Sequence, residues 1–400
     1  MLRRRLLTCA AALAAAALAL PAAAQDKIRI GYAISKSGPN ATGAGITTLP
    51  NYKLWVEDVN AAGGLMLKGT GRKAMLEVVE YDDRSQSEEA VKLIERLVNQ
   101  DKVDFILPPW GTAMNLAVAP LLARAGYPHL AATAATEKVP EFAKRWNSAF
   151  WLLGQSSAYT SGLVEVLKGL RDKNQIGNKV AMVSVADGFG IEMVTAARPI
   201  MKAAGFDLVM DKTYPVGTQD LGALITEAAR LNPDVFVAFS YPPDTIGLTD
   251  QAKTLKFNPK VFYTAVGTAF PIYVKRFDKA ADGVMGIGGW NPDLPATKAY
   301  FERHKKVLNA EPDRWASAVT YASLEILGQA IERVGKIDRA AVIKEINDGT
   351  FQTVIGPVRF EDNQRKVQWL TGQWQDGEFY GVSPANMQGA KPVKFPKPAW

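Results

Sequence analysis

The sequence predicts an α/β protein built from two Rossmann-like, doubly wound lobes, on three observations. Apolar runs typical of buried strands alternate with amphipathic helical patterns through most of the chain. Runs such as VAMVSV and VFVAFS contain almost no polar residues, which is typical of parallel strands covered on both faces. The alternation forms two series, which meet near Trp151, and 400 residues are enough for two hydrophobic cores.

The first 24 residues are predicted to be a secretory signal peptide. Three arginines, Arg3 to Arg5, precede an Ala/Leu-rich stretch, and Ala22 to Ala24 offer a small-residue cleavage site. The only cysteine, Cys9, opens that stretch, so neither a lipid anchor nor a disulfide is expected. Removing the segment lowers the formal charge from +7 to +4 and leaves no basic stripe for nucleic acid. We therefore expect a periplasmic protein.

The first series should form one sheet with its covering helices. The helix at 47–62 ends at Gly63-Gly64, a helix stop signal, and the helix at 87–99 carries acidic residues in its first turn. The expected elements are strands at 27–35, 75–81, 103–107 and near 129, and helices at 47–62, 87–99 and in the segment that ends at 125.

The second series should form another sheet, and the order then changes after Trp290. Three successive helical patterns precede a β-rich end with a hairpin at Gln375-Asp376-Gly377 and a Pro/Lys-rich extended tail at 386–400. The expected elements are strands at 179–185, 206–210, 235–241 and 260–266, and helices at 159–170, 191–204, 221–231, 245–255, 297–308, 316–334 and 339–346.

A candidate anion site lies where two strands of the first series end. Ligands of open parallel sheets bind beyond the carboxyl ends of the strands. The turn at 108–115 opens a helix, whose free N–H groups favour an anion, and Thr112 adds a hydroxyl. The turn at 133–136, TAAT, offers further hydroxyls and amides. The alternative is that Thr112 and Thr136 only cap helices.

A set of segments then resembles a known family. DVNAAGGLMLKG, YDDRSQSEEAVKLIERLV, GYPHLAATAATEKV, YPVGTQDLGALI, GWNPDLPATKAYFERHKK and TVIGPVRFEDNQ occur in an order similar to that of the periplasmic solute-binding proteins of ABC importers, of the leucine/isoleucine/valine-binding type. The resemblance implies a type I periplasmic binding protein fold with three hinge crossings, near 150–151, 286–290 and 355–360. Lobe 1 would comprise 25–148 and 288–356, and lobe 2 would comprise 149–287 and 357–385.

The resemblance also implies a ligand site between the lobes. A ligand carboxylate would be held by two turns, and aromatic side chains would enclose its body, although Trp110 could instead pack under its turn and the other aromatics could belong to the core. The predicted binding residues are Trp110, Gly111, Thr112, Ala113, Ala134, Thr136, Phe189, Tyr241 and Ala265.

The solute that these residues predict is a small carboxylate with an apolar or aromatic body. Amino-acid-binding members place an acidic residue in the loop that corresponds to 264–270, and TAVGTAF contains none. A buried ammonium without a carboxylate would be costly. Branched-chain or other amino acids and amides remain the alternative ligands.

The function predicted from the sequence is that of a receptor. The two histidines, His129 and His304, lie outside any nucleophile motif, and no G-x-S-x-G, P-loop or metal-ligand spacing occurs. We expect no enzymatic activity, cofactor or metal. The expected protein is a monomer that delivers solute to an ABC permease and its ATPase, and the alternative is a ligand sensor for a signalling partner.

Overall fold

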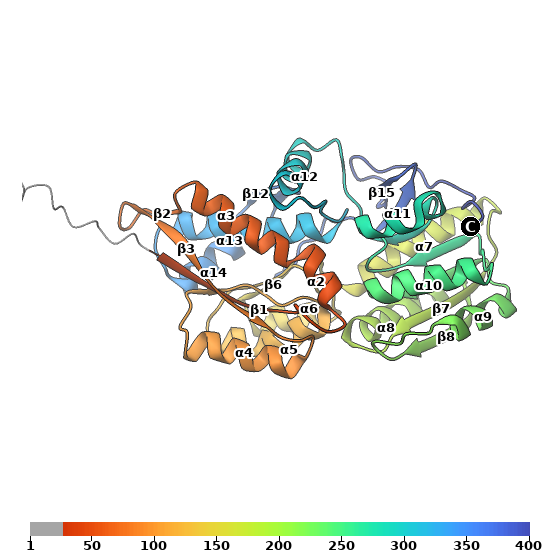
Figure 1. Ribbon diagram of the computed structural model, residues 1–400, viewed down its shortest axis with the longest axis horizontal. Helices are drawn as coiled ribbons and strands as arrows, with labels where there is room; N and C mark the ends of the chain where they lie inside the picture. Colours follow the sequence, from red (N-terminus) through yellow and green to blue (C-terminus); the bar gives the residue numbers. More distant parts are fainter. Residues whose placement is uncertain (1–26) are drawn as a thin grey trace, which may run out of the picture.

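The computed structural model describes residues 27–400, so the predicted signal peptide lies outside the described residues. Two α/β lobes lie side by side along the longest axis of the molecule (Figure 1). The first lobe contains a four-stranded sheet of order β2-β3-β1-β4 and a separate parallel pair, β5 and β6. Its elements are β1 (Lys27–Ile34), α2 (Ala41–Thr47), α3 (Leu49–Ala61), β2 (Leu65–Leu67), β3 (Arg72–Asp82), α4 (Ser87–Asn99), β4 (Phe105–Ile106), α5 (Thr112–Arg124), β5 (His129–Ala131), α6 (Val139–Arg145) and β6 (Ala149–Trp151).

The second lobe is built on a seven-stranded sheet of order β15-β14-β11-β10-β9-β7-β8. The five strands from β7 to β11 pair in parallel. Every residue of β9 is buried, as its apolar sequence predicts. The lobe comprises α7 (Ser156–Asp172), β7 (Lys179–Val185), α8 (Gly188–Ala203), β8 (Asp207–Tyr214), α9 (Gly222–Leu231), β9 (Val235–Phe239), α10 (Pro242–Thr254), β10 (Val261–Thr264), α11 (Pro271–Phe277), β11 (Met285–Ile287), β14 (Thr371–Gln375) and β15 (Glu378–Ser383).

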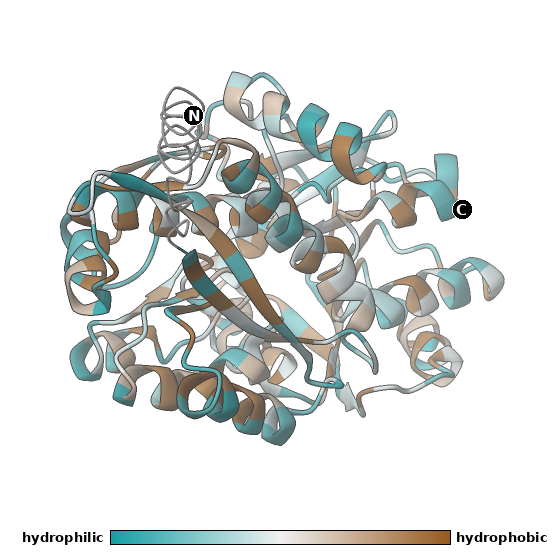
Figure 2. Ribbon diagram, turned by 60° about the vertical axis from the view of Figure 1, so that its left-hand side comes forward, coloured by the Kyte–Doolittle hydropathy of each residue, from teal (hydrophilic) through white to brown (hydrophobic). Residues whose placement is uncertain are grey.

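The surface helices are amphipathic, with hydrophilic and hydrophobic residues on different faces (Figure 2). Helix α4 buries Ala90, Ile94 and Leu97, while its charged residues face outward. The hairpin between β14 and β15 turns at Asp376 and Gly377, both with positive φ (53° and 86°). Two positive φ values suit the type I′ turn that an Asp-Gly pair predicts.

The late helices return to the first lobe, as Figure 1 shows for α13 and α14. Tyr300 donates its hydroxyl to Asn51 Oδ1 (2.6 Å), and Tyr321 donates to Asp58 Oδ2 (2.7 Å), so two late helices are fixed to α3. The elements of this segment are α12 (Pro295–Leu308), α13 (Ala316–Val334), α14 (Arg339–Asp348), β12 (Phe351–Thr353) and β13 (Gly356–Val358). The residue limits predicted for the two lobes stay a prediction.

The chain crosses between the lobes three times, and two of these crossings lie side by side. The first crossing follows β6 and the third follows β13. Between them, Trp151 N donates to Asn363 O (2.8 Å), Arg365 N donates to Trp151 O (3.1 Å) and Gln368 Nε2 donates to Leu153 O (2.7 Å). The second crossing follows β11. This connectivity confirms the predicted fold class.

Several expected elements differ from those observed. The predicted helix at 47–62 is α3, which begins two residues later, at Leu49, because the chain breaks at Thr48 and Pro50 lies in the first turn of α3. The Gly-rich composition of the segment at 37–45 predicts a loop that lines the cleft, but the chain is helical from Ala41 onward, in α2. The sequence patterns also missed the short elements β2, β6, β11, α6 and α11, which are each seven residues or fewer.

The C-terminal residues 386–400 have no regular structure and lie on the second lobe. Lys394 N donates to Gln373 Oε1 (2.8 Å), and Trp400 Nε1 donates to Phe257 O (2.6 Å). Across the described residues, no helix is long and apolar enough to cross a membrane, and no cluster of His, Cys, Asp and Glu could hold a metal ion.

Candidate functional site

A small closed cavity lies between the two lobes, at the ends of strands from both sheets. Its volume is about 20 Å³, which is roughly the space needed by one water molecule. No charged side chain lines it. The lining residues are Thr47, Trp110, Gly111, Thr112, Thr133, Ala135, Leu153, Phe189, Tyr241, Val266, Ile287, Trp315 and Ala316.

The turn between β4 and α5 is fixed by Asn115. Its amide nitrogen donates to Pro109 O and to Gly111 O, both at 2.8 Å, and its Oδ1 lies 2.9 Å from His129 Nε2. Burial lowers the pKa of His129 to about 3, so the imidazole is neutral. Gly111 adopts a φ of 91°, a conformation that favours glycine. These contacts hold the N-terminal end of α5 against the cavity.

Trp110 is buried within this turn and packs on a glycine of α2. A Cβ atom at Gly43 would overlap the Trp110 indole. The indole therefore occupies the space that a side chain at residue 43 would need. Trp110 both packs beneath α2 and lines the cavity, so the two alternatives for its role coexist.

The hydroxyls of the two predicted turns tie these turns together. Gly111 N donates to Thr133 Oγ1 (3.1 Å), and Ala135 N donates to Thr112 Oγ1 (3.3 Å). Thr112 is the first residue of α5 and caps nothing. Both hydroxyls reach the cavity wall, next to first-turn amides that have no acceptor within the helix.

Thr136 lies outside the cavity lining. Its hydroxyl accepts from Lys138 N (3.1 Å), and its own N–H donates to Gly154 O (3.1 Å), so both groups have protein partners. The bond to Lys138 N lies in the turn before α6, whose N-cap is Lys138 and which has no side-chain cap, so the role predicted for Thr136 in binding stays a prediction. The predicted Ala134 and Ala265 are fully buried outside the lining, and Ala113 faces Gly188 of the other lobe.

Three aromatic rings from both lobes enclose one side of the cavity. Phe189 and Tyr241 stack with ring centroids 5.3 Å apart, and Trp110 lies 5.1 Å from Tyr241 across the lobe boundary. The Tyr241 hydroxyl hydrogen-bonds Asp187, which also accepts from Gly190 N (3.0 Å) as the N-cap of α8. Burial raises the pKa of both Tyr241 and Asp187.

The lining residues that sequence reasoning missed have two origins. Thr133, Ala135 and Val266 are direct neighbours of predicted residues in the same turns. The others, Thr47, Leu153, Ile287, Trp315 and Ala316, come from α2, from crossings and from the start of α13. The rule that ligands bind at strand ends does not apply to these segments. The position of Trp315 directly before a helix is a signal that could have identified it.

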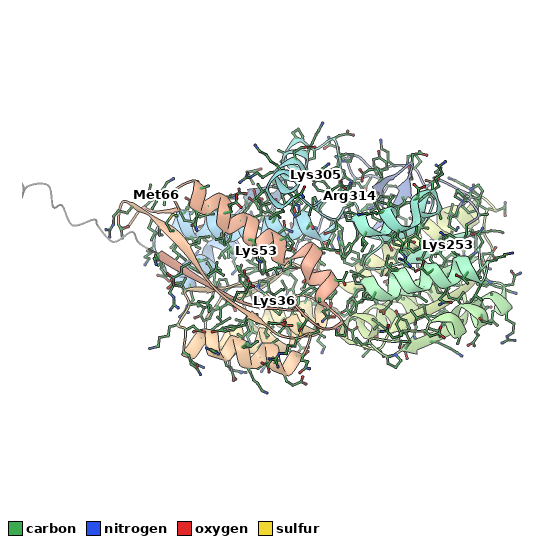
Figure 3. All side chains as sticks on the ribbon, in the orientation of Figure 1. Lys36, Lys53, Met66, Lys253, Lys305 and Arg314 are labelled. Carbon is green, nitrogen blue, oxygen red and sulfur yellow. The ribbon has the colours of Figure 1, made fainter. Side chains whose placement is uncertain are left out.

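The lobes contact each other around the cavity, so the structure is a closed form. Glu137 N of the first lobe donates to Glu192 Oε2 of α8 (2.8 Å). Arg314 precedes α13, and its Nε lies 2.7 Å from Glu378 Oε1 of β15. In Figure 3, Arg314 lies between α12 and α11, where the two lobes meet.

Comparisons with known proteins agree with this architecture. The sequence model of the family described as "Periplasmic binding protein" matches residues 27–378. The Leu/Ile/Val-binding protein homolog 7 of Brucella suis is 24% identical over 387 residues, which cover 92% of this chain and 94% of that protein.

Two solved structures illustrate the range of ligands among similar folds. An ABC transporter solute-binding protein from R. palustris in complex with benzoate has a TM-score of 0.78 and 17% identity, with 92% of this chain and 98% of that chain covered. The substrate-binding protein LivJ of Streptococcus pneumoniae in complex with isoleucine has a TM-score of 0.75 and 21% identity, with 88% and 98% covered.

Proposed function

Because this chain belongs to the periplasmic binding protein family, we propose that it is the extracytoplasmic solute receptor of an ABC importer and that its solute is a small aromatic carboxylate. The lobes close around the solute, and the closed form docks on the membrane permease, whose ATPase drives uptake. The observation that supports this solute class best is the cavity lining, which combines stacked aromatic rings with hydroxyls and has no charged side chain.

The aromatic rings supply the surface for the body of the solute. Phe189, Tyr241 and Trp110 lie within ring-contact distance of each other, and an aromatic solute would be held between rings of both lobes. Because the cavity has room for about one water molecule, the lobes separate before the solute enters, and the lining side chains shift as the lobes close around it. An apolar body gains free energy there by leaving water.

The carboxylate would lie at the start of α5. The Thr112 and Thr133 hydroxyls and the first-turn amides of this helix are donors, and the positive end of the helix favours an anion. The lining contains no acid to balance an α-ammonium group, so an amino acid would lose the hydration of that group without compensation.

A second candidate ligand class is an aliphatic amino acid, favoured by one observation. Asp244 accepts from the backbone N–H of Tyr241 (3.3 Å), and Asp187 hydrogen-bonds the Tyr241 hydroxyl, so the Asp187 carboxyl group lies behind this lining residue. If Tyr241 moved on solute binding, this carboxylate would be exposed to an ammonium group. The structure of LivJ with isoleucine shows that a similar fold accommodates such a ligand.

Calorimetric titration separates the two classes. We expect benzoate and phenylacetate to bind the mature protein and leucine and valine to bind weakly or not at all. Tyr241→Ala should weaken benzoate binding about tenfold or more, because it removes the stacked ring, while Tyr380→Ala, a change of a half-buried tyrosine on β15, should leave the affinity unchanged. Tight leucine binding without benzoate binding at millimolar concentration would reject the aromatic solute.

A further inference from the structure

A second and larger cavity lies at the hinge, on the other side of Trp315 from the cavity between the lobes. Its volume is about 460 Å³, within the range of small-molecule sites. We call it the hinge groove. Segments of the second and third crossings form most of its wall, with the start of α13 and two residues of the C-terminal segment. The lining residues used below are Trp290, Trp315, Arg359, Arg365, Gln368 and Trp369.

The charges of the hinge groove are unbalanced. Arg359 and Arg365 have no ion-pair partner among the described residues, and Lys366 has only a distant one, Asp362 at 3.9 Å. Arg365 Nε donates to Leu152 O (3.1 Å), which fixes its position, and burial lowers its pKa to about 10. Glu361 is the only acid in the lining, and it is exposed. The groove therefore favours an anion.

One buried polar atom of the lining has no hydrogen-bond partner among residues 27–400. Gln368 is 4% exposed, and its Oε1 accepts from no donor. The Trp315 Nε1–H, by contrast, is directed at the buried Tyr159 hydroxyl and is not counted as a donor for a ligand. The Gln368 amide nitrogen is already used, because it donates to Leu153 O (2.7 Å). Buried polar atoms without partners are rare in native proteins, so Gln368 Oε1 is an acceptor that a ligand hydroxyl would satisfy.

Aromatic side chains provide the remaining surface. Trp290, Trp315 and Trp369 all line the hinge groove. Trp290 is held from behind, because it stacks on Phe301 at 4.1 Å and donates to Glu378 Oε1 (3.1 Å). Trp369 is 8% exposed and packs on Gly381, where a Cβ atom would overlap its ring. Rigid indole faces suit a flat apolar body.

We propose that the hinge groove is a second ligand site, which binds a hydroxylated aromatic carboxylate. The carboxylate lies beside Arg359 and Arg365, the ring system lies among the three indoles, and the ligand hydroxyl donates to Gln368 Oε1. This site is separate from the solute cavity between the lobes, although Trp315 forms part of the wall of both.

The site is tested with 6-hydroxy-2-naphthoate, a two-ring probe of this class, by calorimetric titration of the mature protein. We expect binding that Tyr241→Ala leaves unchanged, because Tyr241 lines only the cavity between the lobes. Arg359→Ala should weaken it about fivefold or more, because one charged hydrogen-bond donor is lost. Arg359 is exposed and unpaired, so its removal should not affect folding. Arg230→Ala, an exposed and unpaired arginine on α9, is the matched control.

The results that would reject the hinge site differ from those that would reject the proposed solute of the cavity between the lobes. The hinge site is rejected if the naphthoate does not bind, if Arg359→Ala binds it as tightly as the wild type, or if Tyr241→Ala abolishes its binding. A 2-naphthol titration must also be weaker, because that compound lacks the carboxylate. Benzoate binding that depends on Tyr241 would still support the solute receptor in each of these cases.

Discussion

Two carboxyl groups of the α13 segment differ in how their burial is compensated. Asp313 is fully buried and accepts from Trp315 N (2.8 Å), Ala316 N (2.6 Å) and Ser317 N (2.8 Å). Glu325, in the middle of the helix, accepts only from Val354 N (2.8 Å). Burial raises the pKa of Glu325 to about 7, so the folded protein favours its protonated form.

This pKa gives a pH-dependent prediction for Glu325→Gln. Between the ordinary pKa of 4.5 and about 7, the folded state keeps the proton that the unfolded state releases, so the wild type loses stability as pH rises through this window. The neutral glutamine avoids this loss. We expect the variant to have a higher free energy of unfolding than the wild type at pH 8 and a similar one at pH 4, as measured by urea denaturation. A difference that is the same at both pH values would contradict the assignment.

At the scale of the element, the start of α13 determines where the late helices meet the cavity. Three successive backbone N–H groups converge on Asp313, and the helix then presents Trp315 and Ala316 to the cavity lining. A carboxylate at this end also interacts favourably with the helix dipole. The hydrogen bonds to Asp313 therefore help to fix the positions of Trp315 and Ala316 in the cavity wall.

Asp313→Ala should destabilise the protein by about 3 kcal/mol, because it removes several charge-assisted hydrogen bonds and leaves buried N–H groups without an acceptor. Asp338→Ala is the matched control, since Asp338 caps α14 through a single bond to Ala341 N (3.0 Å) on the surface. It should cost about 1 kcal/mol. If both variants lose the same free energy of unfolding, as measured by thermal and urea denaturation, the buried hydrogen bonds of Asp313 add no stability beyond that of a surface cap.

The elements also show what could be predicted from the sequence. The bounds of α4, α13 and β7 follow directly from apolar periodicity and match the structure. Helix α2 does not, because its two glycines disfavour a helix, and packing of Gly43 on Trp110 overrides this preference.

The candidate site shows the same division. The strand-end rule led to Trp110, Gly111, Thr112, Phe189 and Tyr241, which all line the cavity, although their role in binding stays a prediction. In the turn at 133–136, Thr133 and Ala135 line the cavity, whereas the predicted Ala134 and Thr136 lie outside its lining. Trp315 could not be predicted in this way, because its place depends on how α13 returns to the first lobe.

At the scale of the whole molecule, closure rests on a few polar contacts between lobes. Glu192 of α8 accepts the Glu137 N–H, and Glu137 in turn accepts from Ser157 N (2.6 Å) at the start of α7. Closely packed backbone supports this contact, because a Cβ atom at Gly188 would lie 3.1 Å from Ala113. The lobes also meet at Trp110 and Tyr241 and at Arg314 and Glu378, and we expect such contacts to leave the open and closed forms within a few kcal/mol of each other.

Glu192→Ala should therefore shift the unliganded protein toward the open form. We expect small-angle scattering to give a larger radius of gyration than the wild type has, and added benzoate to reduce it. Glu227→Ala removes a surface carboxylate of the same lobe that pairs with Lys212 (2.6 Å), and it should leave the radius unchanged. An unchanged radius in both variants would mean that the Glu192 contact does not contribute to closure.

The size of the closed cavity also sets the kinetics of capture. With room for about one water molecule, the closed form admits no solute, so association can follow only after the lobes separate. The measured dissociation constant then equals the intrinsic one divided by the open fraction, and a protein that is open about one tenth of the time binds about tenfold more weakly. The association rate should level off at the opening rate as solute concentration rises, and release should be limited by the same motion.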